Sequence, residues 1–438
     1  MNTKTFLTLS FIFSVLMISC TKKQQNPLFE DFNTPYGSIP FSKIKNEHYM
    51  PAIDRGIELA KAEIDSIVNN PEAPTFQNTI EALEKSGSDL NRVNSIFFNI
   101  LEANSDEELM NLSLEASKKL SDYSTDIILN EGLWKRIKAV YENKDQLNLN
   151  PEEATLLQNT YDSFANSGAN LQGEDREKFK KLSSELSELT TVFGQNVLKE
   201  LNTYEIWLTK DDLSGLPETA VNAAAEAAKE KGREGEYLFT LAQPIYIAFM
   251  KYSSRPDLRE KMYKLYMGRN MQGEYSNMEN VKKISSLRLE IAKLLGFNNF
   301  AEQKLKDTMA QTPDAVYNLL DQLRDAYRPA QMKEFEELTA YASELEGKPV
   351  KIMPWDYSYY SNKLKEAKYS FDEEALRPYF ELNNVIDGVF GLATKLYGLK
   401  FTEVKDVDIY HPDVKAYKVE DENGKYVGLI YTDFFPRE

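Results

Sequence analysis

Apolar residues at helical spacing recur along most of this chain and constrain its fold more than any other feature. Leu182, Leu186, Leu189, Phe193 and Val197 lie four, three, four and four residues apart, which places all five on one face of a helix. We predict helices at three further stripes: Ile53, Ile57, Ala60, Ile64 and Ile67; Ile80, Leu83, Leu90, Val93 and Phe97, after a cap at Thr75; and Ile284, Leu287, Ile291, Leu294 and Leu295, ended by Gly296.

Strand-like sequence is scarce. Residues 204–208 and 237–241 are short candidates, and the clearest pair is 415–419 with 426–434, joined by a segment whose Asn423-Gly424 favours a hairpin turn. Residues 218–235 are rich in Ala, Glu and Lys and indicate a solvated helix and loop. We therefore expect a mainly α protein with a small β-hairpin near its C-terminus.

Length and charge set the broad class. A chain of 438 residues allows two or three domains or one large helical body. The 69 acidic and 52 basic residues give a formal net charge of −17, which argues against nucleic acid or an anionic membrane surface as a direct partner. We expect a monomer.

The N-terminus resembles a bacterial lipoprotein signal. Lys4 precedes a largely apolar run at residues 6–18, which is too short to span a membrane. Met17-Ile18-Ser19-Cys20 resembles a lipobox, and Cys20 is the only cysteine. We expect residues 1–19 to be a signal peptide, Cys20 to be lipidated and residues 20–26 to be a tether, which would place the protein in the bacterial cell envelope, in the periplasm. The alternative is an ordinary secretory signal with a chance cysteine.

Chemistry-bearing motifs are missing from the sequence. The only histidines, His48 and His411, are far apart and each lacks a second histidine within a helical turn, so we interpret both as structural. There is no Gly-x-Ser-x-Gly elbow and no phosphate-binding glycine loop. Runs of carboxylates such as Asp106-Glu107-Glu108 are typical of solvated faces. From the residues alone we assign no catalytic, cofactor-binding or metal-binding position.

Several short motifs nevertheless follow one another in a defined order: Pro74–Glu84, Ser95–Asn99, Leu287–Phe297 with Phe300-Ala301, Pro354–Tyr360, Leu376–Phe380 and Gly428–Arg437. Each motif alone is weakly specific, whereas their order over residues 27–438 is fairly specific. Together they resemble the M3 family of zinc metallopeptidases, the thimet oligopeptidase-like group, and most of all its peptidyl-dipeptidase Dcp branch.

The resemblance implies a large helical body of two lobes with a deep channel that admits short peptides. It implies a first lobe that begins with residues 27–160, a second lobe at residues 161–349 and a return to the first lobe at residues 350–438. In this family two histidines of a His-Glu-x-x-His helix and a distant glutamate bind one zinc, and the motif glutamate is the general base. Members like Dcp release dipeptides from peptide C-termini.

The sequence departs from the family at every catalytic position, because the family's zinc helix lies downstream of the segment matched by Tyr431–Arg437. We therefore expect zinc in a longer parent protein, no specific metal site in this chain, and no peptidase activity from this chain alone. The alternative is a non-catalytic, helical, peptide-binding lipoprotein. An unrelated helical scaffold is a third, weaker hypothesis.

Two segments are candidates for contact with a peptide. The aromatic cluster at Trp355, Tyr357, Tyr359 and Tyr360 could bind a peptide near a cleft, but we favour a packing role, with Trp355 and Tyr359 one helical turn apart. The resemblance also suggests that the strand at residues 427–434 walls a cleft.

Overall fold

The computed structural model describes residues 26–370 and 374–435, and helices account for most of them. The signal peptide, Cys20 and nearly all of the expected tether lie outside the described residues. The chain divides into two compact units. The first unit has three segments, which are the described residues up to Glu63, Gly87–Leu109, and the described residues from Gly398 onward. The second unit has two segments, which are Ile64–Ser86 and the described residues between Met110 and Tyr397. The lobe boundaries expected from the resemblance remain a prediction.

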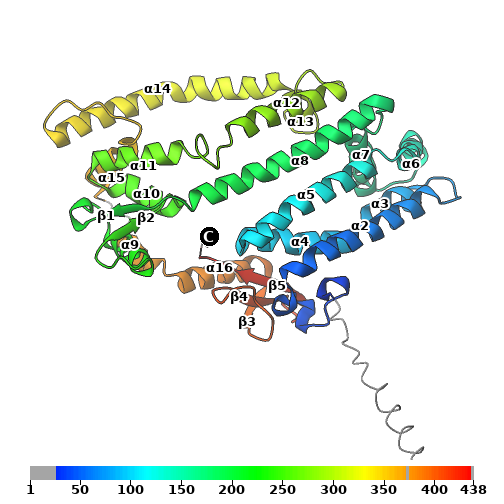
Figure 1. The fold of residues 1–438 in the computed structure, drawn as a ribbon, viewed down its shortest axis with the longest axis horizontal. Helices are drawn as coiled ribbons and strands as arrows, with labels where there is room; N and C mark the ends of the chain where they lie inside the picture. The colour runs from blue at the N-terminus through cyan, green and yellow to red at the C-terminus, as the bar shows by residue number, and fades with distance from the viewer. Residues whose placement is uncertain (1–25, 371–373, 436–438) are drawn as a thin grey trace, which may run out of the picture. The chain divides into compact units, whose positions relative to one another are not determined.

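Figure 1 shows the ribbon with its labels. The helices are α2 (Asn46–Val68), α3 (Ala82–Lys85), α4 (Ser88–Ala103), α5 (Glu107–Ile128), α6 (Glu131–Glu142), α7 (Pro151–Asn166), α8 (Gly173–Leu201), α9 (Glu218–Glu230), α10 (Gln243–Tyr252), α11 (Pro256–Met267), α12 (Met278–Leu294), α13 (Phe300–Leu305), α14 (Pro313–Glu346), α15 (Tyr357–Tyr369) and α16 (Leu382–Tyr397). The strands are β1 (Ile206–Leu208), β2 (Tyr237–Phe239), β3 (Lys400–Val404), β4 (Lys415–Glu420) and β5 (Tyr426–Thr432).

The predicted mainly α class is confirmed. The stripes at residues 53–67 and 182–197 lie in α2 and α8, and the stripe at residues 284–295 lies in α12 except for Leu295, which directly follows that helix. The prediction for the apolar residues after Thr75 was wrong in one respect, because these residues do not lie on one continuous helix. Thr75 does cap the segment, and its hydroxyl accepts a hydrogen bond from the Asn78 amide at 3.1 Å. The helix then breaks at Gly87, which has a φ of 71° that residues with a side chain rarely adopt.

In the first unit, α2 and α4 pack closely. Tyr49 and Phe97 make an edge-to-face contact with ring centroids 5.1 Å apart, and Ile53, Leu90 and Val93 are buried beside them. At Gly56 a β-carbon would lie 3.0 Å from the Leu90 α-carbon. A side chain at that position would therefore push the two helices apart.

The same unit holds a three-stranded antiparallel sheet in the order β3-β4-β5. The predicted hairpin is confirmed as β4 and β5, with Ala416 opposite Tyr431, and Gly424 supplies the positive φ in the connecting loop. Strand β3, which pairs Phe401 with Val419, was not predicted from the sequence. Both short strand candidates near residues 206 and 238 are also confirmed, and they pair with each other in the second unit.

The second unit contains several apolar clusters. In one, Phe179 and Leu182 of α8 pack with Leu287 and Ile291 of α12, and Figure 1 shows these helices side by side. In another, β1, β2, α10 and α11 surround Phe239 and Phe249.

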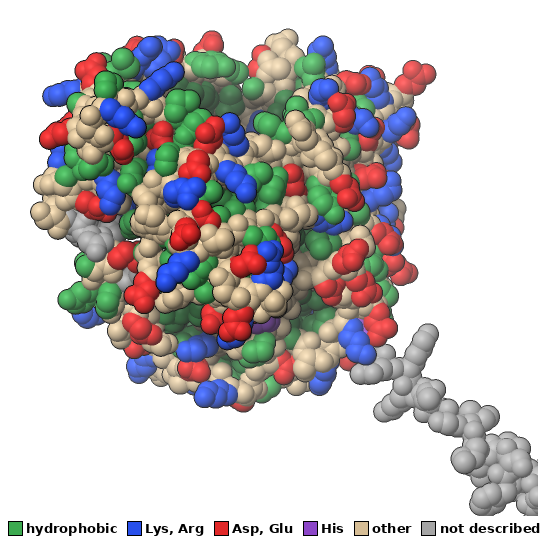
Figure 2. Space-filling view, turned by 60° about the vertical axis from the view of Figure 1, so that its left-hand side comes forward, with side chains coloured by type: hydrophobic (Ala, Val, Ile, Leu, Met, Phe, Trp, Pro, Cys, Tyr) green, Lys and Arg blue, Asp and Glu red, His purple; other side chains and the backbone are tan. Residues whose placement is uncertain are grey.

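Figure 2 shows basic and acidic side chains interspersed over the face that it presents. Within the described residues, no helix is both long and apolar enough to cross a membrane.

Candidate functional site

The aromatic cluster that the sequence analysis singled out lies at the start of α15. Asp356 directly precedes this helix and is buried, although a carboxylate in the interior is costly unless it is paired. Its partner is Arg259 of α11, which is 1% exposed and donates a hydrogen bond of 2.7 Å to the carboxylate. A second Arg259 nitrogen donates to the Ser253 carbonyl at 2.7 Å. This buried ion pair joins α11 to the beginning of α15.

One face of α15 packs into the interior. Tyr359 and Tyr360 are buried against Leu338 and Ala342 of α14, and the Arg259 guanidinium lies 4.2 Å from the centre of the Tyr359 ring. The Tyr360 hydroxyl donates to the Glu346 carboxylate at 3.1 Å. Burial, and then the negative charge of Glu346, raise the pKa of Tyr360 to about 12. Tyr360 therefore stays protonated at neutral pH and has a structural role.

Trp355 lies just before the helix instead of on it, so the proposed helical pairing of Trp355 with Tyr359 was wrong. It still packs against the cluster around Phe249, with its ring centroid 6.0 Å from that of Tyr263. The packing interpretation therefore holds for Trp355, Tyr359 and Tyr360. Tyr357 differs, because its side chain is 53% exposed and lines a pocket.

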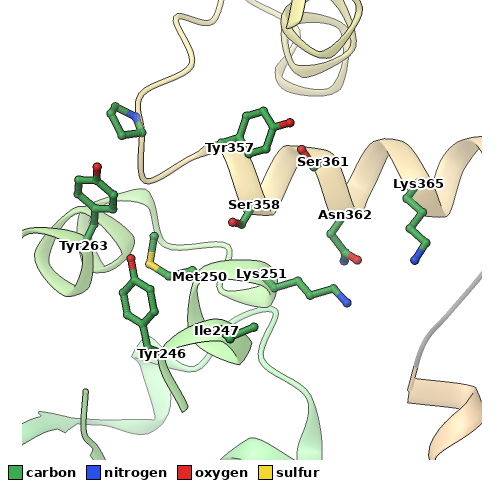
Figure 3. Close-up of a pocket in the computed structure, with 11 residues that line it drawn as sticks. Tyr246, Ile247, Met250, Lys251, Tyr263, Tyr357, Ser358, Ser361, Asn362 and Lys365 are labelled. Carbon is green, nitrogen blue, oxygen red and sulfur yellow. The ribbon is translucent and has the colours of Figure 1, made fainter. Parts of the chain in front are cut away.

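That pocket has a volume of about 400 Å³ and lies between three helices of the second unit. Figure 3 shows its lining. The spacing of the α15 residues in this lining places them on the side of the helix opposite Tyr359 and Tyr360. The lining residues are Tyr246, Ile247, Met250 and Lys251 of α10, Tyr263 of α11, Pro354, and Tyr357, Ser358, Ser361, Asn362 and Lys365 of α15.

The chemistry of this α15 pocket suits binding. Its lining combines an apolar base at Ile247 and Met250 with phenol, hydroxyl and amide groups. Lys251 and Lys365 point to the same end of the pocket as Asn362 (Figure 3). None of its described lining residues is acidic, although the chain as a whole has a net charge of −17. Such a pocket can accept carbonyl and carboxylate groups together with an apolar side chain.

The described lining of the α15 pocket contains no carboxylate and no histidine that could serve as a general base beside Ser358 or Ser361. Burial, followed by the neighbouring Tyr263 and Tyr266 hydroxyls, raises the pKa of Tyr246. Tyr246 therefore stays a hydrogen-bond donor and is not a base at neutral pH.

Most of this lining was not predicted from the sequence. The helical repeat of Ser358, Ser361 and Lys365 on one face of α15 could have indicated a polar surface. It could not have indicated a pocket, because the opposite wall comes from α10 and α11, about a hundred residues earlier in the sequence. The geometry therefore depends on tertiary packing.

The strand expected to wall a cleft is β5, in the first unit. Its Tyr431 lines a second pocket of about 290 Å³ with Phe41, Ile96 and Tyr410. The Phe41 ring makes edge contacts with both tyrosines, at centroid distances of 5.4 Å and 5.9 Å. The buried Tyr431 hydroxyl has no hydrogen-bond partner among the described residues. A cleft beyond this pocket remains a prediction.

Both histidines take part in local turns of the first unit. The His48 Nδ1 atom accepts a hydrogen bond from the Lys45 amide at 3.1 Å. The His411 Nδ1 atom accepts one from the Asp413 amide at 3.3 Å. These contacts fit the structural role that the sequence analysis assigned to both side chains.

Comparisons with known proteins identify the family. Residues 249–438 match the model of peptidase family M3, and this stretch contains α11, α14, α15 and the three-stranded sheet. This part of the chain is a domain of peptidase family M3. It is 34% identical over 416 residues to the dipeptidyl carboxypeptidase of Escherichia coli K12, and this alignment covers 94% of the chain and 61% of that protein.

The chain is also similar to proteins named as oligopeptidases. The chain is 33% identical over 419 residues to oligopeptidase A of Escherichia coli K12, covering 94% of the chain and 61% of that protein. It is 26% identical over 415 residues to a thimet-like oligopeptidase of Dictyostelium discoideum, covering 92% of the chain and 59% of that protein. The chain thus spans about three fifths of the length of these relatives.

The described residues do not fit the zinc ion that the resemblance implies. They contain no group of three or more His, Cys, Asp and Glu side chains that could hold a metal ion. We therefore assign no zinc-dependent step to residues of this chain.

Proposed function

We propose that this chain is the peptide-binding part of an exported M3 peptidase that releases dipeptides from the C-termini of short peptides. The observation that carries the proposal is the 34% identity to a dipeptidyl carboxypeptidase over 94% of the chain. The similar identity to oligopeptidase A makes internal cleavage the second candidate. Zinc and its ligands belong to a longer parent polypeptide, and residues 1–438 alone do not hydrolyse peptides.

The α15 pocket gives this proposal a structural basis. Backbone carbonyls of a bound peptide can accept hydrogen bonds from its phenol and hydroxyl groups, and an apolar side chain can lie on Ile247 and Met250. A terminal carboxylate is compatible with the end that carries Lys251 and Lys365. Binding by this pocket requires no metal ion.

Calorimetry of the 438-residue chain with tetrapeptides, together with product analysis, tests binding and hydrolysis separately. We expect binding without hydrolysis, with or without added zinc. Ser361→Trp should fill the pocket and weaken binding at least tenfold, whereas Ala367→Trp, on an exposed part of the same helix, should not. Equal binding by both variants would remove the pocket from the proposal, and zinc-dependent hydrolysis by this chain would contradict its assigned role.

Sequencing of the gene beyond the codon for Glu438, followed by assay of the complete product, tests the parent activity. We expect a His-Glu-x-x-His motif and chelator-sensitive release of dipeptides. If the complete product has no such motif and binds peptides without cleaving them, the protein is a non-catalytic peptide-binding lipoprotein. Release of longer fragments would favour the oligopeptidase alternative.

Export and anchoring rest on the N-terminal sequence. We propose that Cys20 is lipidated and tethers the protein in the bacterial cell envelope, facing the periplasm. Metabolic labelling with a radioactive fatty acid should mark the wild-type protein and not the Cys20→Ser variant. Release of unlabelled wild-type protein into the soluble fraction would instead indicate an ordinary secretory signal.

A further inference from the structure

Helix α16 has a wide apolar face, of which the described residues cover only half. One stripe, formed by Leu382, Ile386, Phe390 and Ala393, is buried or half-buried. The neighbouring stripe is apolar as well, but its members are 39%, 59%, 58% and 63% exposed: Val385, Val389, Leu392 and Leu396. Because successive residues turn by about 100°, these two stripes are adjacent and occupy nearly half of the helix surface.

The polar residues of α16 show that this exposure is selective. Asn384, Asp387, Thr394 and Lys395 lie on the remaining side of the helix, where solvent is the natural environment. A surface helix normally turns its whole apolar stripe towards a core. The sequence of α16 is therefore that of a helix buried along both stripes.

Helix α14 shows the same contrast along its length. Leu338 and Ala342 are buried against α15, whereas Leu320, Leu323 and Tyr327 are 51%, 41% and 67% exposed. The exposed and buried residues share one stripe, since Tyr327 and Leu338 are eleven residues, or about three turns, apart. Among the described residues, the stripe is covered at the C-terminal end of the helix and exposed over most of the rest.

We propose that the exposed stripes of α14 and α16 are surfaces on which the rest of the M3 peptidase packs. Both helices lie in the stretch that matches the family, and the chain corresponds to only 61% of the E. coli dipeptidyl carboxypeptidase. The occupant is thus a segment of the same longer polypeptide that presents apolar side chains. A second copy of this chain is disfavoured, because each copy carries a net charge of −17.

This inference rests on family membership and is independent of dipeptide release, so an inactive parent protein would not overturn it. Exposed apolar patches of this kind are typical of interaction surfaces. The packing surface is also distinct from the α15 pocket, because none of the residues in the two stripes lines that pocket.

Thiol accessibility tests the proposal without any activity assay. In a Cys20→Ser background, Leu323→Cys and Leu392→Cys report on the two stripes, and Asn318→Cys and Lys395→Cys are matched controls on the polar sides of the same helices. The rate of reaction with a maleimide is measured in the 438-residue chain and in the polypeptide encoded by the whole reading frame. Val389→Cys replaces Leu392→Cys if the latter prevents folding.

In the 438-residue chain all four thiols should react at similar rates. In the longer polypeptide, the two stripe thiols should react at least tenfold more slowly, while the control thiols keep their rates. Equal reactivity of stripe and control thiols there would overturn the proposal, as would a reading frame that adds no residues. Protection that grows with the concentration of the 438-residue chain would also overturn it and would identify a second copy as the occupant.

Discussion

Helices α15 and α16 lie close together in the sequence but differ in how completely they are packed. In α15, one face is buried against α14, the first turn is joined to α11 by an ion pair, and the other face lines a pocket. In α16, Ile386 is buried and the adjacent apolar stripe is exposed. Among the described residues, the inward face of α15 is thus packed, whereas only one of the two apolar stripes of α16 is buried or half-buried.

Removal of the buried ion pair of α15 should lower the free energy of unfolding more than any other change considered below. Asp356→Ala leaves the buried Arg259 guanidinium without its carboxylate, and we expect a loss of about 3–5 kcal/mol from the free energy of unfolding. Urea unfolding followed by the fluorescence of nearby Trp355 measures this loss. Asp321→Ala removes an exposed ion pair with Arg324 and should cost less than about 1 kcal/mol. Equal losses would show that the buried pair has no special role.

The stripe of α14 allows a comparison within one helix. Leu338→Ala should lower the free energy of unfolding by about 2–5 kcal/mol, because it leaves a cavity against Tyr359 and Tyr360. Leu320→Ala, on the same stripe but exposed, should change it by about 0.5 kcal/mol or less in the 438-residue chain. A large effect of Leu320→Ala would mean that this part of α14 already has a partner.

Tyr360 should make α15 sensitive to alkaline pH. Its pKa is raised from 10.0 to about 12 by burial and then by Glu346, so the fold favours the protonated phenol. The resulting stabilisation is fully present below pH 10 and is lost as the pH rises through 12. Tyr360→Phe should cost about 1 kcal/mol at pH 8, through the lost hydrogen bond to Glu346.

Urea unfolding of wild type and Tyr360→Phe across this pH range measures the difference. The wild type should lose more stability between pH 10 and pH 12 than the variant does. The variant should still lose some, because burial and neighbouring carboxylates also raise the pKa values of Tyr49 and Tyr204 to about 12. Parallel curves for the two proteins would contradict the role assigned to Tyr360.

A substitution on the exposed stripe of α16 should change the free energy of unfolding of the 438-residue chain least. Leu392→Ser replaces a side chain that is 58% exposed, and we expect a change of about 0.5 kcal/mol or less in the free energy of unfolding. Ile386→Ser, on the buried stripe, should cost several times more. Thermal unfolding of both variants would test this order, and a larger loss for Leu392→Ser would reverse our assignment of the two stripes.

The sequence was sufficient to predict secondary structure where local patterns determine it. Spacing alone placed α8 and α12, and the Asn-Gly turn placed the β4–β5 hairpin. The prediction of helices failed where a local feature overrode the apolar pattern, as at Gly87. The prediction of strands failed at β3, which carries the charged residues Lys400 and Glu403.

The candidate site depended on contacts that local patterns do not encode. Arg259 and Asp356 are 97 residues apart, and nothing in either neighbourhood indicates the other. The sequence could not separate Tyr357, which lines the pocket, from Tyr359 and Tyr360, which are buried. Only the tertiary structure shows which side of α15 faces which partner.

Hydrogen exchange of α15 and α16 tests the central comparison most directly, when measured by mass spectrometry in the 438-residue chain and in the polypeptide of the whole reading frame. We predict that α15 is protected equally in both, whereas α16 exchanges quickly in the shorter chain and gains at least tenfold protection in the longer one. Equal exchange of α16 in the two proteins would contradict the account, because its exposed stripe would then need no further partner.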